Sequence, residues 1–255
     1  MIRSAIVAAL FALQAAPQIE VPAPPPIEQA RIFATYPHDT AAFTEGLLID
    51  HGQLYESTGR EGQSDIRRVD LKTGRVLARA KLSASLFGEG IVAWQRHLFS
   101  VTWHGGQGFR WTLPGLKRSG GFRYSGEGWA MTDDGQNLIL SDGTPVLRFL
   151  DPVTLKVVRR LTVTIGGRPL ERLNELEYVR GELLANVWMT RYVVRIDPAT
   201  GKVKGIIDLT PLIAKIALTD RDSVANGIAY DRDANKLYAT GKNWPTLFEI
   251  ALPGG

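Results

Sequence analysis

The sequence repeats one short pattern five times. In each copy an acidic or amide residue stands just ahead of an apolar run, and a leucine follows eight to eleven residues after it. Successive copies start 44, 38, 48 and 51 residues apart, and they begin at Glu45, Glu89, Glu127, Glu175 and Asn226. Repeats of this length are typical of folds in which one four-stranded sheet per repeat is arranged around a common axis. The sequence therefore predicts an all-β protein, a five-bladed β-propeller.

Each copy reads as a strand, a tight turn and a second strand. In the last copy the turn is Asp231-Arg232-Asp233, and the second strand covers residues 237–240. Two more strands follow in most copies. After the fourth copy, residues 194–197 alternate apolar and polar, residues 197–201 form a turn, and residues 203–207 lead outward. Aspartate, proline and glycine at such positions are typical of turns between strands.

The last copy lacks a strand of its own, because residues 246–250 are its third strand and only five residues follow. Residues 31–36, ahead of the first copy, resemble the outer strands expected at residues 76–80 and 158–161. We therefore predict that an N-terminal strand completes the last blade and closes the ring, since closure leaves no unpaired sheet edge at the seam.

The first 30 residues differ in composition from the rest. Residues 1–16 combine a basic start with a short apolar run, which is typical of an export signal. Residues 17–30 are rich in proline and indicate an extended tether. We expect the propeller domain to cover residues 31–255 and the protein to be exported, either periplasmic or secreted. Contact with a membrane is expected only if the signal stays attached as an anchor.

Bulk composition excludes some functions. The formal net charge is +4, but no run of five like charges occurs, so nucleic-acid binding is not expected. The chain has no cysteine, so neither thiol chemistry nor a disulfide is available. The hydrophobic content of 44% is ordinary for a folded domain. We expect a monomer.

The repeat also predicts a functional site. The innermost strand of each propeller blade lines the axis, so the first residues of these strands should gather at one mouth of the central channel. The polar residues expected there are Glu45, Glu89, Glu127, Asn226 and either Glu175 or Asn174. Crowded carboxylates in a partly dry mouth raise one another's pKa, so one of them can serve as an acid or base near neutral pH. Lys242 enters the same mouth after the second strand of the last blade, as an ion-pair partner or as a catalytic group.

Tryptophans accompany these polar residues. Trp103, Trp188 and Trp244 each follow a second strand, and Trp129 lies close to Glu127. Packing between blades would explain each indole singly. Several indoles beside carboxylates would instead form a small apolar pocket with a few polar groups, the usual form of a small-molecule site.

Metal binding is the main alternative. Glutamate and asparagine oxygens at a propeller axis are suitable ligands for calcium. The four histidines show no paired ligand spacing, and without cysteine a zinc site has little support. We expect neither a metal nor a cofactor.

Motifs from every repeat together resemble one known family, the plant-type glutaminyl-peptide cyclotransferases, which also occur in bacteria. The likeness covers residues 31 to 250, and it is carried by the segments Phe43-Thr44-Glu45-Gly46-Leu47, Phe87-Gly88-Glu89-Gly90, Gly126-Glu127-Gly128-Trp129, Leu173-Asn174-Glu175, Asn186-Val187-Trp188, Asn226-Gly227-Ile228-Ala229 and Thr240-Gly241-Lys242-Asn243-Trp244.

The resemblance implies an enzyme that converts the N-terminal glutamine of a peptide or protein into pyroglutamate and releases ammonia, without a catalytic metal. It implies a catalytic role for Glu89 and site roles for Asn174 and Lys242. The pocket residues that it implies, together with those from the charge argument, are Phe43, Glu45, Phe87, Trp103, Glu127, Trp129 and Trp188. Family members often carry glutamine where this chain has Glu45. The alternative functions are a calcium-dependent propeller lactonase and a peptide-binding propeller without catalysis.

Overall fold

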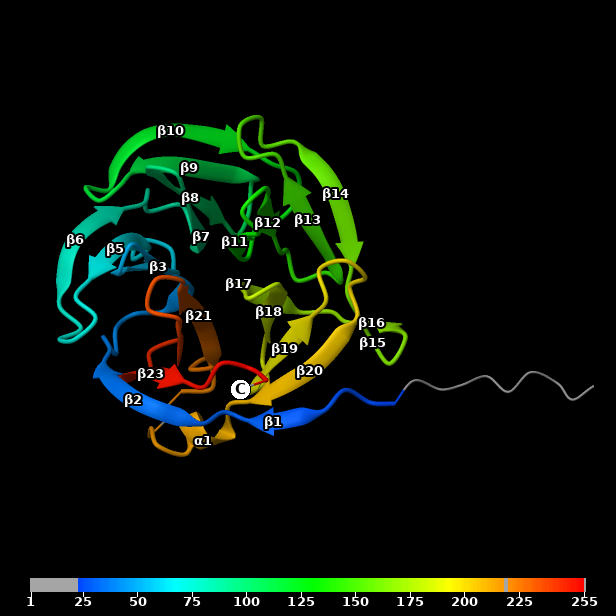
Figure 1. Cartoon of the computed structure of the whole chain (residues 1–255). Helices are drawn as coiled ribbons and strands as arrows, with labels where there is room; N and C mark the ends of the chain where they lie inside the picture. The colour runs from blue at the N-terminus through cyan, green and yellow to red at the C-terminus, as the bar shows by residue number, and fades with distance from the viewer. Residues whose placement is uncertain (1–22, 218–219, 255) are drawn as a thin grey trace, which may run out of the picture.

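The chain forms a ring of β-sheets around a central axis (Figure 1). A computed structural model describes residues 23–217 and 220–254, so the expected export signal and the first part of the tether lie outside the described residues. Within those ranges the sheets make five blades, which confirms the predicted propeller. The first three blades, from the axis outward, are β3 to β6 (Thr44–Asp50, Gln53–Thr58, Asp65–Val69, Val76–Lys81), β7 to β10 (Gly88–Trp94, His97–Thr102, Gln107–Thr112, Lys117–Arg123), and β11 to β14 (Met131–Asp133, Leu138–Leu140, Val146–Leu150, Val157–Thr162).

The last two blades include strands from the N-terminal part of the chain. The fourth blade is β17 to β20 (Leu173–Val179, Glu182–Val187, Tyr192–Ile196, Val203–Asp208), and the fifth is β21 to β23 (Ala225–Asp231, Lys236–Gly241, Thr246–Ile250) with β2 (Ile32–Pro37). Strand β2 pairs antiparallel with β23, from Ile32 opposite Ile250 to Pro37 opposite Thr246. The predicted closure of the ring by an N-terminal strand is confirmed.

The structured part of the chain begins earlier than expected. Residues 17–30 were assigned to a tether, but Ile27–Gln29 forms β1, which pairs parallel with β20 as a fifth strand of the fourth blade. Ala30 is buried in the core between the fourth and fifth blades. Only three residues pair in this way, which is too short a run to show an alternating pattern. The remaining elements are the hairpin β15 and β16 (Thr164–Ile165, Arg168–Pro169) and the helix α1 (Thr210–Ile213).

The core is divided among the blade interfaces. Each apolar cluster contains residues from two neighbouring blades, and each of the five interfaces has one. The cluster between the first and fifth blades, for example, joins Leu47, Leu54 and Val69 to Ala229 and Tyr238. The strands are apolar on both faces because each sheet is covered by a neighbour on either side. The second strands are therefore almost wholly buried, as in β12 and β22.

The glycine that follows the acidic residue in several copies of the repeat has a steric cause. A Cβ atom on Gly90 would lie 2.3 Å from the Cα of Ala130, and one on Gly46 would lie 3.0 Å from the Cα of Gly90. The Gly90 N–H also donates a 2.9 Å hydrogen bond to the carbonyl of Trp129, in the next blade. Neighbouring inner strands thus approach so closely at the axis that only glycine fits.

A buried ion pair stabilises the contact between the residue that follows β2 and strand β4 of the first blade. His38 Nε2 lies 2.9 Å from Glu56 Oε1, and Thr44 Oγ1 donates to the same oxygen at 2.7 Å. Burial by itself would lower the pKa of His38, but Glu56 raises it above the ordinary 6.5. Burial would raise the pKa of Glu56, but His38 and Arg67 lower it below the ordinary 4.5. Each group of the pair therefore favours the charged form of the other.

Within the described ranges no helix has the length and apolar character needed to cross a membrane.

We predict that Gly90→Ala destabilises the protein by about 2 kcal/mol or more, because overpacking against a neighbouring backbone typically costs about 1–3 kcal/mol and this contact is with rigid main chain. Gly120→Ala is the matched control, since its Cβ would meet only flexible atoms of the Arg110 side chain at 3.9 Å. Urea unfolding followed by tryptophan fluorescence compares the two. Equal midpoints would contradict the steric argument.

We predict a pH-dependent cost for Glu56→Gln. The lowered pKa of Glu56 contributes stability above the ordinary pKa of 4.5, which is lost as pH falls through the folded value. The raised pKa of His38 contributes stability below 6.5, which is lost as pH rises through the folded value. The difference in unfolding free energy between wild type and variant should be largest between pH 4.5 and pH 6.5, and it should be smaller at lower and at higher pH. A gap that is constant from pH 4 to 9 in urea titrations would contradict the ion pair.

Candidate functional site

A cavity of about 230 Å³ opens at the mouth of the ring where the inner strands begin. It contains every site residue that the family resemblance and the charge argument together implied except Glu127, while Asn226, Glu175 and Trp244, which the repeat also brought toward this mouth, are not part of its lining. Its lining consists of Phe43, Glu45, Phe87, Glu89, Trp103, Trp129, Asn174, Trp188, Met189, Asp222 and Lys242. Residues up to two hundred positions apart in the sequence thus meet in one small pocket.

The polar side chains are placed by irregularities at the start of the inner strands. Strand β3 shifts register between Thr44 and Gly46, and β7, β17 and β21 shift at the equivalent point. A β-bulge adds an unpaired residue and redirects its side chain. The residues set free in this way are Glu45, Glu89, Asn174 and Asn226.

The bulges also correct the alignment of the fourth repeat. Asn174, and not Glu175, is the counterpart of Glu89, because Leu173 and Leu176 bracket it as Gly88 and Ile91 bracket Glu89. Glu175 takes the place that glycine has in the other copies. Its Oε1 accepts a 2.8 Å hydrogen bond from the N–H of Leu47, two blades away, so this side chain reaches across the axis. Burial raises the pKa of Glu175 well above 4.5.

Lys242 occupies a position that tryptophan has in two other blades. Its N–H donates to the carbonyl of Val224, as the N–H of Trp103 donates to Phe87 and that of Trp188 to Arg172. Trp244, which was predicted to share this position, is instead wholly buried in the core, where its indole N–H donates to the carbonyl of Ser223 at 3.0 Å. Of the two interpretations that the sequence left open for Trp244, packing in the core holds, because β22 ends at Gly241 and Lys242, not Trp244, directly follows the strand.

Glu45 and Lys242 form a buried ion pair. Lys242 Nζ lies 2.7 Å from Glu45 Oε1, and Asn226 Nδ2 donates to Glu45 Oε2 at 3.3 Å. Burial raises the pKa of Glu45 to about 7, although Lys242 opposes the shift. Lys242 Nζ also lies 4.5 Å from the centroid of the Phe43 ring, in range for a cation–π contact.

Glu89 lies in the same pocket without a cation of its own. Burial and the neighbouring carboxyl of Glu45 raise its pKa well above 4.5, and Lys242 only partly offsets the rise. Two carboxyls in one dry site disfavour each other's ionisation. The pocket therefore holds a carboxyl that is more readily protonated than an exposed glutamate and is suited to proton transfer.

Aromatic rings wall the cavity on two sides. The rings of Phe43 and Phe87 lie 6.3 Å apart, those of Phe87 and Trp103 5.5 Å apart, and those of Trp129 and Trp188 5.7 Å apart, all edge to face. Two glycines make room for the rings. A Cβ on Gly59 would lie 2.4 Å from the Phe87 ring, and one on Gly143 would lie 2.6 Å from that of Trp129.

Glu127 supports the pocket from outside. It is absent from the lining of the cavity, and its Oε2 accepts hydrogen bonds from the indole N–H groups of Trp103 at 2.9 Å and Trp129 at 2.8 Å. Arg148 holds the loop in place by donating to the carbonyls of Ser125 and Glu127. Its hydrogen bonds fix the two indoles, and contact of Glu127 with substrate stays a prediction.

Sequence reasoning missed Met189 and Asp222, which line the outer part of the cavity. Met189 follows Trp188 in a turn with a positive φ of 63°, and Asp222 lies in the connection that enters the last blade. Both are in loops, where no periodic pattern marks which side chains face the axis. The only signal for Met189 was its place beside a predicted pocket residue.

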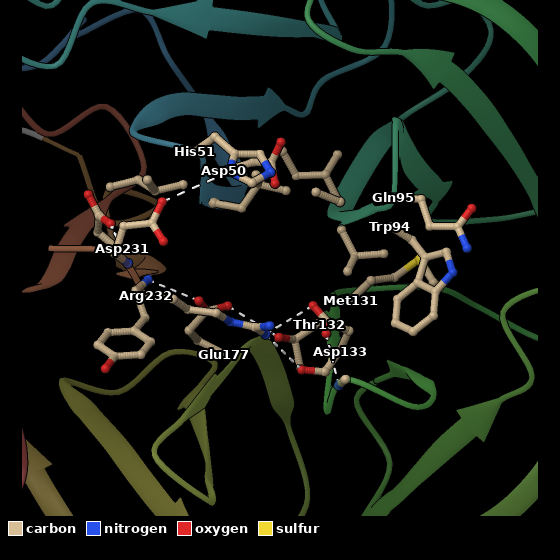
Figure 2. Close-up of a pocket in the computed structure, with 18 residues that line it drawn as sticks. Asp50, His51, Trp94, Gln95, Met131, Thr132, Asp133, Glu177, Asp231 and Arg232 are labelled. Carbon is tan, nitrogen blue, oxygen red and sulfur yellow. Dashed lines mark hydrogen bonds and ion pairs between the residues drawn. The ribbon is translucent and has the colours of Figure 1, made fainter. Parts of the chain in front are cut away.

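A second and larger cavity, of about 380 Å³, lies at the opposite mouth (Figure 2). Several carboxylates line it, but three of them already form an ion pair or accept hydrogen bonds within the protein. Asp133 pairs with Arg232 at 3.1 Å, Asp231 caps its own turn, and Glu177 accepts from the Tyr230 N–H at 2.9 Å. Burial raises the pKa of Glu177 to about 8. None of the predicted site residues lies in this cavity.

Among the residues that the structure describes, no group of three or more histidine, cysteine, aspartate or glutamate side chains is arranged to hold a metal ion.

Known proteins share both the sequence and the fold. The model of the glutamine cyclotransferase family matches residues 4–252. A glutaminyl-peptide cyclotransferase from Arabidopsis thaliana is 40% identical over 230 residues, which are 89% of this chain and 72% of the plant protein. A crystal structure of glutaminyl cyclase from Myxococcus xanthus superimposes with a TM-score of 0.84 at 36% identity, over 89% of this chain and 97% of the other.

We predict that Lys242→Met raises the pKa of Glu45 above its value of about 7, because the cation that favours the ionised carboxylate is removed. The carboxyl should then stay protonated at neutral pH. Infrared difference spectra with labelled glutamate, or carbon NMR titration, would follow it. Lys236→Met, which breaks the 3.0 Å contact with Glu249 away from the pocket, is the control and should leave the titration of Glu45 unchanged. An unshifted Glu45 in Lys242→Met would contradict the pairing.

Proposed function

We propose a reaction for the aromatic cavity on the premise that this chain belongs to the glutamine cyclotransferase family. The chain is a glutaminyl-peptide cyclotransferase, which closes the N-terminal glutamine of a peptide or protein into pyroglutamate and releases ammonia. The observation that carries the proposal is a pair of buried carboxyls and a lysine inside an aromatic pocket of about 230 Å³.

The reacting groups of the substrate are its α-amine and its own side-chain amide. The amine, with an ordinary pKa of about 7.7–8.0, must be unprotonated to attack the amide carbon. A new bond then forms between the α-nitrogen and that carbon, and the carbonyl oxygen becomes negative. Collapse of this intermediate breaks the bond to the amide nitrogen, which leaves as ammonia once it has gained a proton.

We assign the proton transfer to Glu89. Its carboxylate accepts the proton that the attacking nitrogen loses, and the resulting acid delivers that proton to the departing nitrogen. Burial and the neighbouring Glu45 carboxyl raise the pKa of Glu89 well above 4.5, which makes its carboxylate a stronger base than an ordinary one. General acid and base catalysis of this kind contributes roughly 10² to 10⁴ in rate. Holding the glutamine side chain in one rotamer offsets only about 2 kcal/mol of entropy, so shape alone is insufficient.

We assign the stabilisation of the negative oxygen to Asn174 and Lys242. Both line the cavity, and the ammonium group keeps donors available beyond the one that binds Glu45. A preorganised donor of this kind contributes about 10² to 10³ in rate. The aromatic rings supply a dry surrounding in which these interactions are strong. The mechanism we propose is independent of a metal.

We propose export, from the basic and apolar start of the sequence at residues 1–16, and a monomeric enzyme.

We predict that Glu89→Gln lowers kcat for ammonia release from a glutaminyl dipeptide amide by at least about 10²-fold, because the amide cannot shuttle the proton. Glu182→Gln is the control. It alters a glutamate that pairs with Arg195 and Lys204 outside the pocket, and it should leave turnover unchanged. Circular dichroism confirms that both variants fold. Wild-type turnover in Glu89→Gln would remove Glu89 from the mechanism.

The same assay tests the metal-independent part. Wild-type protein dialysed against EDTA should retain full turnover. Loss on chelation and recovery with calcium would overturn that part and favour metal chemistry. Stable binding of glutaminyl peptides with no ammonia release from any of them would overturn the reaction itself.

A further inference from the structure

A third cavity, of about 260 Å³, adjoins the aromatic pocket through a shared wall. Phe43 lines both, and on the far side the cavity continues between the ends of β4 and β6 in the first blade. We call it the basic groove. It is lined by Asp39, Ala41, Phe43, Thr58, Gly59, Arg60, Gly62, Gln63, Asp65, Arg67, Arg79 and Lys81. A peptide whose first residue fills the aromatic pocket has this groove as a neighbouring surface.

The carboxylates of the groove are already paired. Arg67 binds Asp65 at 2.8 Å and Asp39 at 2.9 Å, and Arg79 binds Asp65 at 3.0 Å. The groove has four cationic side chains and two carboxylates. Among the described residues, Arg60 and Lys81 have no carboxylate within ion-pair distance, so unpaired positive charge remains at the junction with the pocket, on Arg60, and at the end of the outer strand β6, on Lys81.

Arg60 is held rigidly at the junction. Its guanidinium lies 4.3 Å from the centroid of the Phe43 ring, while Lys242 lies 4.5 Å from the same centroid. The residue adopts a positive φ of 79°, and its carbonyl accepts hydrogen bonds from the N–H groups of Gln63 and Ser64 and from the Ser64 hydroxyl. A non-glycine residue in this backbone region persists only where the surroundings fix it.

We propose that the basic groove binds a carboxylate of the substrate that lies downstream of the N-terminal glutamine, so that the enzyme favours acidic peptides. The proposal rests on the proposed function of the aromatic pocket. An extended chain advances about 3.3–3.6 Å per residue, so a second or third residue that leaves the pocket beside Phe43 reaches Arg60. The carboxylate belongs either to an aspartate or glutamate side chain or to the end of a short peptide.

The test compares matched glutaminyl tripeptides. Gln-Glu-Ala and Gln-Gln-Ala, both with amidated ends, differ by one charge at nearly equal shape, and Gln-Gln-Ala with a free end places the carboxylate at the terminus instead. Wild-type enzyme should show kcat/KM about three- to fivefold higher for the carboxylate that binds, as partly exposed ion pairs do. The preference should appear mainly in KM and decline at high salt.

Lys81→Gln is the decisive variant, because Lys81 lines the basic groove and is not part of the lining of the aromatic pocket. It should reduce the preference for the acidic peptide while turnover of amidated Gln-Gln-Ala stays at the wild-type level. Lys72→Gln is the matched control, since this lysine lies in the turn at the other end of the same blade. It should keep the wild-type preference. Arg60→Gln with Lys81→Gln should abolish the preference.

The outcomes separate the two proposals. Equal kcat/KM for all three peptides, or a preference that survives in the double variant, would overturn the basic groove as a carboxylate site and leave the cyclisation intact. No ammonia from any of the peptides would overturn the proposed function. A preference confined to the free terminus would assign the groove to the end of short peptides and not to acidic side chains.

Discussion

The close approach of neighbouring inner strands at the axis is the constraint on which the rest of the structure depends. Gly46 and Gly90 let these strands meet at main-chain distance, and that contact sets how far the ring can open. With larger residues there the strands would separate, and the bulges that begin them would no longer face one another. Glu45 and Glu89 would then lie in a wider, wetter mouth, where neither burial nor mutual repulsion could raise their pKa values. Steric fit at the axis thus determines the acid–base chemistry of the pocket.

The four glutamates at and around the pocket have different partners and therefore different roles. Glu45 is neutralised by Lys242, Glu89 is left without a cation, Glu127 holds two indoles, and Glu175 spans the axis. The repeat supplies the same side chain at related positions, and the partner at each position decides its role. A lysine in place of tryptophan at the end of one second strand is enough to make two neighbouring carboxyls different. This asymmetry is the basis on which we assign the proton transfer to Glu89 and not to Glu45.

Much of this could be predicted because the repeat is long and regular. Its spacing gave the number of blades, and the residues 31–36 gave the closure, since both depend on apolar periodicity that the whole sheet must satisfy. The alignment of Asn174 and Glu175 could not be predicted, because an unpaired residue at a bulge shifts the register by one position without altering the apolar pattern. The place of Trp244 stayed open because an indole suits the core as well as a pocket wall. Met189, Asp222 and Arg60 lie in loops, where the chain path and not a sequence period determines which side chains meet.

The seam between β2 and β23 has a consequence for how the molecule is made. One partner is synthesised near the start of the chain and the other near its end, with Pro37 opposite Thr246. Three blades form their sheets from consecutive residues, the fourth adds β1, and the fifth is complete only when β2 pairs with β23. While β2 is unpaired, the outer edge of β23 is an open sheet edge able to pair with a second chain. The same contact that closes the ring within one chain is thus also the contact through which two chains can exchange a strand.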